Sequence, residues 1–105
     1  MEKNVLDFKS GLFKVISDSN RLKILELLRD GPLCQCEIIP VIGQSQPTVS
    51  RHLSLLEDAG LIHKTRKGAK TFYNVVDPHI YRLLDSIDDN MKTLITEERT
   101  RKLPI

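Results

Sequence analysis

The sequence contains no tryptophan, three phenylalanines and two tyrosines among 105 residues. So few aromatic side chains argue against a stacking platform for single-stranded nucleic acid. The two cysteines are too few for a disulfide scaffold. No apolar run approaches the roughly 20 residues needed to cross a bilayer, and residues 1–11 lack the apolar stretch and small-residue cleavage site of a secretory signal. These absences exclude the membrane-spanning and secreted classes, and we expect a cytoplasmic protein with no membrane partner.

Hydrophobic residues make up 40% of the chain, which is enough for one core, and 105 residues are the size of one domain. The net charge is +2, but residues 44–76 hold five basic and two acidic residues, while the flanking segments are close to neutral. A local surplus of Lys and Arg favours contact with phosphates, because binding releases counterions. Lysines that protect strand edges from aggregation are the alternative explanation.

Apolar spacing and capping residues predict five helices and one β-hairpin in a mainly α fold. The helices are expected at about 4–17, from Asp18 or Ser19 to Gly31-Pro32, at about 34–41, from near Ser45 to Asp58, and at about 78–97. The hairpin is expected from residues 61–66 and 71–76, on either side of a glycine-containing turn. This order is that of a winged helix-turn-helix, with a DNA-binding core at about 18–76 in a single domain spanning 1–105.

The helix that begins near Ser45 has the pattern of a recognition helix. At about 100° per residue, its inward face holds Val49, Leu53 and Leu56. Its other face suits a major groove, where Arg reads guanine, Gln reads adenine, and Ser or Thr bonds base edges or phosphates. The predicted contacts are Ser45, Gln46, Thr48, Ser50 and Arg51. His52 lies at the boundary, either as a further DNA contact or as a packing histidine bonded to backbone.

The hairpin would form the wing and lie beside the neighbouring DNA backbone or minor groove. Its predicted DNA contacts are Lys64, Arg66, Lys67 and Lys70. Cations placed against phosphates give affinity without sequence preference. The sequence therefore predicts two DNA-binding elements, a helix and a wing.

Apolar residues after position 79 form a stripe about four turns long. They are Ile80, Leu83, Leu84, Ile87, Met91, Leu94 and Ile95. One three-helix core cannot cover this stripe and that of the first helix, so we expect a homodimer formed by the helices at about 4–17 and 78–97. An intramolecular helix pair is the alternative. A twofold dimer predicts an inverted-repeat operator.

Cys34 and Cys36 are expected in the first turn of the third helix, where the helix dipole favours thiolates. Two thiolates attract thiophilic ions such as As(III), Sb(III) or soft divalent metals. Positions i and i+2 of a helix point about 200° apart, so binding one ion would require that turn to unwind. The distortion would reach the recognition helix and couple ion binding to DNA binding. Two buried cysteines acting as small apolar residues are the alternative.

Two segments carry a resemblance to a known family. They are residues 18–28, DSNRLKILELL, and residues 33–78, which include LCQC and QSQPTVSRHL. Over most of its length the chain resembles the arsenic-repressor (ArsR) family of winged-helix metalloregulators. The resemblance implies a homodimeric transcriptional repressor that binds double-stranded operator DNA without a cofactor. It also implies release from the operator when arsenite, antimonite or another thiophilic ion binds Cys34 and Cys36.

The cysteine site departs from the pattern of these relatives. Ile39 stands where arsenite-responsive relatives often have a third cysteine, and residues 1–33 lack the N-terminal cysteines that cadmium and lead sensors recruit. The remaining coordination position is open to an outside thiol, an organic group on trivalent arsenic, or the other subunit.

A second metal site is indicated only weakly. Asp77 and His79 match the first half of the site of zinc-sensing relatives, but Asn90 and Thr93, at the remaining positions, are poor zinc ligands. A simpler explanation is that Asp77 caps the following helix and His79 lies on the surface.

Several alternatives to arsenite sensing remain, one of which is a winged-helix regulator with no inducer at these cysteines. The same repressor could be switched by cysteine oxidation, because a Cys-x-Cys disulfide closes a small, strained and easily reduced ring. It could instead be a cadmium or zinc sensor. A thiol oxidoreductase is more remote, since the Cys-x-x-Cys spacing and the βαβ pattern are absent. The sequence shows no phosphate loop and no Ser-His-Asp set, so we do not expect an enzyme.

Overall fold

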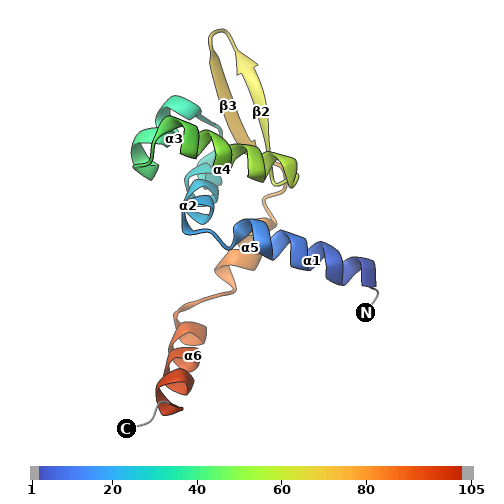
Figure 1. The fold of residues 1–105 in the computed structure, drawn as a ribbon, viewed down its shortest axis with the longest axis vertical. Helices are drawn as coiled ribbons and strands as arrows, with labels where there is room; N and C mark the ends of the chain where they lie inside the picture. Colours follow the sequence, from blue (N-terminus) through green and yellow to red (C-terminus); the bar gives the residue numbers. More distant parts are fainter. Residues whose placement is uncertain (1–2, 103–105) are drawn as a thin grey trace.

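The computed structural model describes residues 3–102 and shows a mainly α fold with a small antiparallel sheet (Figure 1). The helices are α1 (Lys3–Ile16), α2 (Ser19–Leu27), the 3-10 turn η1 (Leu28–Asp30), α3 (Gln35–Ile42), α4 (Gln46–Asp58), α5 (Ile80–Asp85) and α6 (Asp89–Arg101). The strands are β1 (Leu33–Cys34), β2 (Ile62–Lys67) and β3 (Lys70–Val75), in the sheet order β1-β3-β2. Residues 1–2 and 103–105 of the predicted domain lie outside the described residues. No helix within 3–102 is long and apolar enough to cross a membrane.

Capping side chains explain where α2 and α4 begin. The Asp18 carboxylate accepts two backbone N–H groups of the first turn of α2, at 2.8 and 3.2 Å. Ser45 Oγ accepts the Thr48 N–H at the start of α4, at 3.3 Å. Pro47 lies in that first turn, where its missing N–H would have no helical partner. Gly60, at φ 78°, follows the end of α4 in a conformation that favours glycine.

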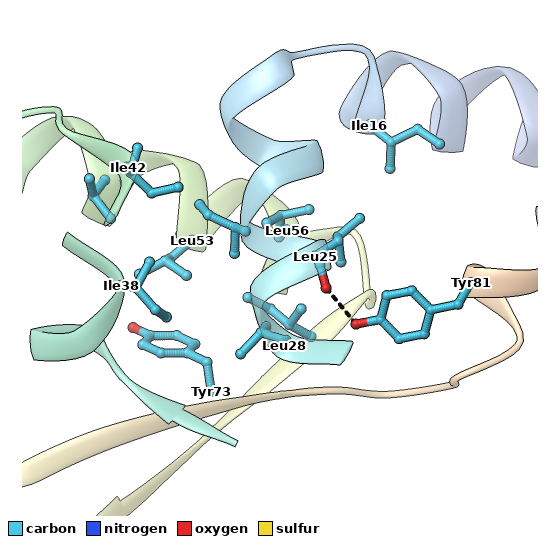
Figure 2. Close-up of a cluster of buried hydrophobic side chains, with 12 residues drawn as sticks. Ile16, Leu25, Leu28, Ile38, Ile42, Leu53, Leu56, Tyr73 and Tyr81 are labelled. Carbon is cyan, nitrogen blue, oxygen red and sulfur yellow. Dashed lines mark hydrogen bonds between the residues drawn. The ribbon is translucent and has the colours of Figure 1, made fainter. Parts of the chain in front are cut away.

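One hydrophobic core joins α2, α3, α4, the sheet and α5 (Figure 2). Val49, Leu53 and Leu56 are fully buried, which confirms the predicted inward face of α4. Tyr73 closes the cluster from β3, and Tyr81 closes it from α5. Burying each large aliphatic side chain contributes about 1.5–3 kcal/mol. This packing therefore fixes the position of α4 relative to α2 and α3.

The predicted hairpin is confirmed as β2 and β3, which turn at Gly68 with φ 62°. The two strands project from the helices as a wing (Figure 1). The strand β1 was not predicted. Its residues Leu33 and Cys34 pair antiparallel with Tyr73 and Phe72 of β3. Two residues carry no alternating pattern, so β1 exists through this pairing with a distant segment rather than through a local signal.

The prediction of one helix at about 78–97 is wrong, because the segment forms the two helices α5 and α6, and α6 extends to Arg101. Asp88 Oδ1 accepts the Met91 N–H at 2.9 Å and so caps a new helix. Ser86 Oγ donates to the Leu83 carbonyl at 2.6 Å, where α5 ends. The apolar spacing continues across the break, which is why the sequence pattern indicates a single helix.

The short helix α5 is anchored to α2. The Tyr81 hydroxyl donates to the Leu25 carbonyl at 2.6 Å (Figure 2). Arg29 lies 4.5 Å from the centre of the Tyr81 ring and bonds both Asp85 oxygens, at 2.8 and 2.9 Å. These bonds hold the pKa of Asp85 below its usual range. The helix α5 therefore belongs to the core of the fold.

The helix α6 projects away from the rest of the chain, at the opposite end from the wing (Figure 1). All of its side chains are exposed. The described chain measures 58 × 36 × 24 Å, and its radius of gyration is 16.5 Å. A compact domain of 100 residues has a radius of gyration of about 13 Å. The chain is therefore extended by an element that packs on little of its own core.

Candidate nucleic-acid interface and cysteine pair

The N-terminal half of α4 presents the predicted base-reading residues at the surface. Ser45, Gln46 and Arg51 are exposed, and Thr48 and Ser50 are half-buried. Ser45 Oγ also donates to Thr48 Oγ1 at 2.9 Å, so the helix start orients both hydroxyls. Within residues 3–102, Arg51 has no hydrogen bond or ion pair to another side chain. Its guanidinium is therefore available to a ligand.

His52 lies between α4 and α2 instead of on the exposed face of α4. Its side chain is 12% exposed, and its Nε2 is 4.0 Å from Asp18 Oδ1. Its Nδ1 is 3.4 Å from an Arg21 guanidinium nitrogen, and Arg21 also donates to the Val15 carbonyl at 2.5 Å. Burial raises the pKa of Asp18, but two backbone N–H groups and His52 hold this pKa below its usual range. The partners of His52 are thus side chains, not the backbone groups that the packing alternative supposed.

The wing carries the predicted cations at its surface. The exposed residues are Lys64, Arg66, Lys67 and Lys70. Lys64 Nζ lies 3.6 Å from a Glu57 carboxylate oxygen, which links the wing to the end of α4. Lys67 Nζ lies 6.0 Å from the centre of the Phe72 ring. Lys70 pairs with Lys67 at the tip of the wing and also lies beside the cysteine pair.

The prediction that Cys34 and Cys36 both lie in the first turn of α3 is wrong. Cys34 is the N-cap of α3 with extended backbone (φ −72°, ψ 149°), and its Sγ accepts the Cys36 N–H at 2.9 Å. Glu37 Oε1 accepts the Cys34 N–H at 3.0 Å, which completes a capping box. The two Cα atoms are 5.1 Å apart, and the sulfur atoms are joined as a disulfide. The prediction that the turn must unwind before the sulfurs converge is therefore wrong, because Cys34 lies outside the helix.

A hollow of about 400 Å³ lies beside the cysteine pair. Its lining residues are Cys34, Gln35, Cys36, Ile39, Gln46, Ala69, Lys70 and Thr71. Gln35, which stands between the cysteines, donates from Nε2 to Ser50 Oγ of α4 at 2.6 Å. The cysteine pair thus borders both α4 and the wing. Sequence analysis missed Gln35, and its position between the two cysteines is the signal that could have found it.

Asp77 and His79 lie in the exposed segment before α5 and contact each other. Asp77 Oδ1 accepts the His79 N–H at 2.9 Å and lies 2.7 Å from His79 Nδ1. Both contacts hold the pKa of Asp77 below its usual range. Asp77 is not the helix cap that the simpler explanation supposed, because His79 occupies the N-cap position of α5. Among residues 3–102, no group of three His, Cys, Asp or Glu side chains could hold a metal ion.

The arrangement of α3, α4 and the hairpin defines a class of protein. The turn between the two helices begins at Gly43, which has φ 74° and ends α3. The helix α4 follows with its polar N-terminal half exposed, and the cationic hairpin projects beside it (Figure 1). These features are those of a winged helix-turn-helix DNA-binding domain.

Comparison with known proteins identifies the family within this class. Residues 18–64 match the family described as "Bacterial regulatory protein, arsR family". An arsenical resistance operon repressor of Staphylococcus aureus is 36% identical over 90 residues, which are 86% of this chain and 83% of the relative. The chain belongs to the ArsR family of transcriptional regulators. It is therefore a DNA-binding regulator and not an enzyme.

The chain is also similar to a cadmium resistance regulator and to a solved homodimeric domain. The cadmium resistance transcriptional regulatory protein CadC of Listeria innocua is 36% identical over 77 residues, which are 72% of this chain and 65% of that protein. The homodimeric winged helix-turn-helix DNA-binding domain of a possible ArsR-family regulator from Mycobacterium bovis superposes with a TM-score of 0.69 at 25% identity. That match covers 96% of this chain and 86% of the other.

Proposed function

We propose that this chain is a homodimeric repressor that leaves its operator when a thiophilic ion binds Cys34 and Cys36, with arsenite or antimonite favoured. The observation that carries the proposal is the position of the sulfur pair. It borders a hollow that Gln46 of α4 and Lys70 of the wing also line. A ligand held by the sulfurs would lie against both DNA-binding elements. Two thiolates favour soft ions over Mg²⁺ or Ca²⁺, and the similarity to an arsenical resistance repressor supports the choice of ion.

In this proposal α4 enters the major groove of operator DNA in the cytoplasm, and the wing lies along the backbone. Arg51 and Gln46 are the base-reading candidates, because both side chains are exposed on the N-terminal half of α4. The wing cations neutralise phosphates. His52 supports α4 from inside through Arg21, so we assign it to positioning rather than to DNA contact.

The proposed dimer forms through α1 and the C-terminal helices. Several large apolar side chains are exposed there. They are Val5, Leu6, Phe8 and Phe13 on α1, and Ile87, Met91, Leu94 and Ile95 at and after the break before α6. An isologous interface would remove both sets from water. The similarity to a homodimeric domain supports this assembly, and its twofold axis would match an inverted-repeat operator.

The test is fluorescence anisotropy with labelled duplex DNA from upstream of the gene for this protein. The reduced chain is titrated onto the duplex and then challenged with arsenite, antimonite, cadmium and zinc in separate experiments. We expect tight, salt-sensitive binding that arsenite or antimonite reverses. Binding that none of these ions reverses would refute ion sensing, and a failure to bind even random DNA would refute the repressor itself.

The control variant is Cys34→Ser. Serine is a good N-cap residue, so its hydroxyl can accept the Cys36 N–H that the thiol accepts in the structure. We expect this variant to bind the duplex as the parent chain does and to remain bound when arsenite is added. Normal release by the variant would place the inducer site elsewhere.

The joined sulfur atoms favour oxidation as a second candidate switch. A peroxide would take two electrons and two protons from the two thiols, leaving a disulfide and water. This candidate predicts release by hydrogen peroxide, a mass loss of two hydrogens per chain, and recovery with a dithiol reductant. Release by arsenite under strictly reducing conditions would favour ligation instead.

A further inference from the structure

One polar contact links the residue between the two cysteines to the recognition helix. Gln35 is the first residue of α3, and its Nε2 donates to Ser50 Oγ at 2.6 Å. Both side chains are half-buried, so water competes with this bond less than at the surface. Within residues 3–102, no other hydrogen bond between side chains joins α3 to α4. A change at the start of α3 therefore has a direct polar route to α4.

The backbone of Gln35 is constrained by the state of the two sulfurs. A link between Cys34 and Cys36 closes a ring that contains Gln35 as its middle residue. The link can be the disulfide seen here or a trivalent arsenic atom bound to both sulfurs. Either one restricts the backbone torsions of Gln35 and, with them, the direction of its side chain. Without a link, the ring is open, and the backbone torsions of Gln35 are set by its position as the first residue of α3.

The position of Ser50 gives the contact a consequence for DNA. Gln46 and Ser50 are separated by one helical turn and lie on the same side of α4. This side borders the cysteine hollow through Gln46 and receives Gln35 through Ser50. Ser50 lies in the N-terminal half of the recognition helix, where a hydroxyl can bond a base edge or a phosphate. The contact with Gln35 fixes the position of this oxygen and the direction of its remaining donor, so it restricts how the hydroxyl can meet DNA.

We propose that Gln35 is the positioning residue that transmits the bridging of Cys34 and Cys36 to the recognition helix, by holding the Ser50 hydroxyl. This inference rests on the proposed function, since it names the route by which a bridged sulfur pair lowers DNA affinity. In the bridged state Gln35 binds Ser50 and restrains α4 against α3. In the open state Ser50 is released to the DNA.

The test uses phenylarsine oxide as the bridging probe on the full-length reduced chain. Its arsenic exchanges one oxygen for the two sulfurs, so that two thiols and one oxide give a dithioarsenite and one water with no change of oxidation state. Mass spectrometry confirms one phenylarsenic group per chain. Anisotropy with the upstream duplex then gives the ratio of the dissociation constants of the bridged and open chains. This ratio is compared between the parent chain and Gln35→Met, which keeps the length of the side chain but removes its donor.

We expect the variant to load the probe fully and to bind DNA in the open state as the parent chain does. Its ratio should be about five-fold or more below that of the parent, because one net hydrogen bond is worth about that factor in an equilibrium constant. Ser50→Ala should lower the ratio similarly, whereas the exposed Gln44→Met and Ser54→Ala should leave it unchanged. Gln35→Glu should restore the ratio, since the Ser50 hydroxyl can donate to a carboxylate.

Two outcomes overturn the inference, and they are distinguishable. If the parent chain releases DNA on bridging and Gln35→Met releases it equally, the route through Gln35 is wrong while the proposed function stands. If the parent chain loads the probe and keeps its DNA affinity, the proposed function fails as well. A structural role alone would change the open-state affinity or the melting temperature of Gln35→Met and leave the ratio unchanged.

Discussion

At the scale of single residues, Arg51 on the recognition helix α4 and Arg21 on α2 have different surroundings. Arg21 is held by the Val15 carbonyl and by His52, so its guanidinium is part of the packing beneath α4. Arg51 is exposed and has no partner within residues 3–102. A planar guanidinium with unused donors matches the two acceptors of a guanine edge. This contrast separates a structural cation from one that can recognise a base.

Replacing Arg51 by alanine should weaken specific DNA binding by roughly 1–3 kcal/mol, because a bidentate base contact has about that worth. Binding to random DNA should change much less. Anisotropy on the upstream duplex and on a scrambled duplex measures both quantities. Arg82→Ala, an exposed arginine on α5, is the matched control. Equal losses on the two duplexes would identify Arg51 as a phosphate contact.

Replacing Asp18 by alanine should lower the free energy of unfolding by about 1 kcal/mol, because α2 loses its N-cap. Asp18→Asn can still accept hydrogen bonds and should cost less. The pKa of Asp18 is lowered in the folded state, so its charged form stabilises the fold above the pKa of the unfolded chain. This stabilisation disappears as the pH falls through the lower folded pKa. Urea denaturation at pH 7 and near pH 3 should show the gap between parent and Asp18→Ala narrowing in acid.

The geometry of the cysteine pair depends on whether α3 begins at Cys34 or one residue later, and the sequence does not decide between the two. Helical spacing predicts opposite directions for Cys34 and Cys36 if both are helical. In the structure Cys34 is the last residue of β1, where it pairs with Phe72, and the helix begins one residue later. The capping residue Glu37 is visible in the sequence, but the strand partner is 38 positions away. The two cysteines could therefore be predicted as a site. Their relative orientation could not, because it depends on pairing with a distant strand.

At the scale of elements, the wing has a local sequence signal for a hairpin and carries the cations that the proposed phosphate contacts would use. Alternation and the Gly68 turn made β2 and β3 predictable. The exposed Lys67 on β2 lies near the hairpin turn and over the ring of Phe72. Its ammonium remains at the surface, where it can approach a phosphate.

Replacing Lys67 by alanine should weaken binding to every DNA sequence and reduce the slope of log affinity against log salt by about one, because one phosphate contact is lost. The measurement is a salt titration of both the upstream and the scrambled duplex. Lys92→Ala on α6 is the control, since this exposed lysine lies on the helix that projects away from the wing. An unchanged slope would show that the wing does not contact phosphate at this position.

The C-terminal helices show where periodicity misleads. The apolar spacing of Ile80, Leu83 and Leu84 continues to Ile87 and Met91. The helix is nevertheless interrupted at residues 86–88. Asp88 is a recognisable N-cap, but a capping residue inside an unbroken apolar stripe is also compatible with one long helix. Tertiary contacts of α5 favour the break, because Tyr81 bonds Leu25 of α2 and Arg29 of η1 lies over the Tyr81 ring. Such contacts have no local signature in the sequence.

At the scale of the whole molecule, the described chain leaves large apolar side chains in water at both ends of its sequence. Phe8 on α1 is 68% exposed and Leu94 on α6 is 59% exposed. Several exposed large apolar side chains on one element are typical of an interaction site. The sequence indicated the apolar stripes and predicted a homodimer that would cover them. It did not show that α6 projects as a separate helix, because that depends on the break after α5.

Replacing Leu94 by glutamate should shift the chain from dimer to monomer in sedimentation velocity, because a charge would enter the proposed apolar interface. Affinity for an inverted-repeat duplex should fall with it. Thr93→Glu is the matched control, since Thr93 lies beside Asp89 and Glu97 on the polar face of α6. Dissociation by neither variant, or by both equally, would contradict this interface.

Because α6 is separate from the rest of the chain, the protein concentration would itself control operator occupancy in the proposed dimer. All side chains of α6 are exposed in the single chain. In the proposed dimer this helix gains its contacts from a second copy, so the operator-binding species would form in proportion to the square of the monomer concentration. While monomers prevail, halving the number of chains lowers the number of dimers about four-fold. When synthesis or proteolysis changes the number of chains, promoter occupancy would then change more steeply than that number does. The projecting helix would thus set a threshold of expression below which the promoter stays open whether or not an inducer is present.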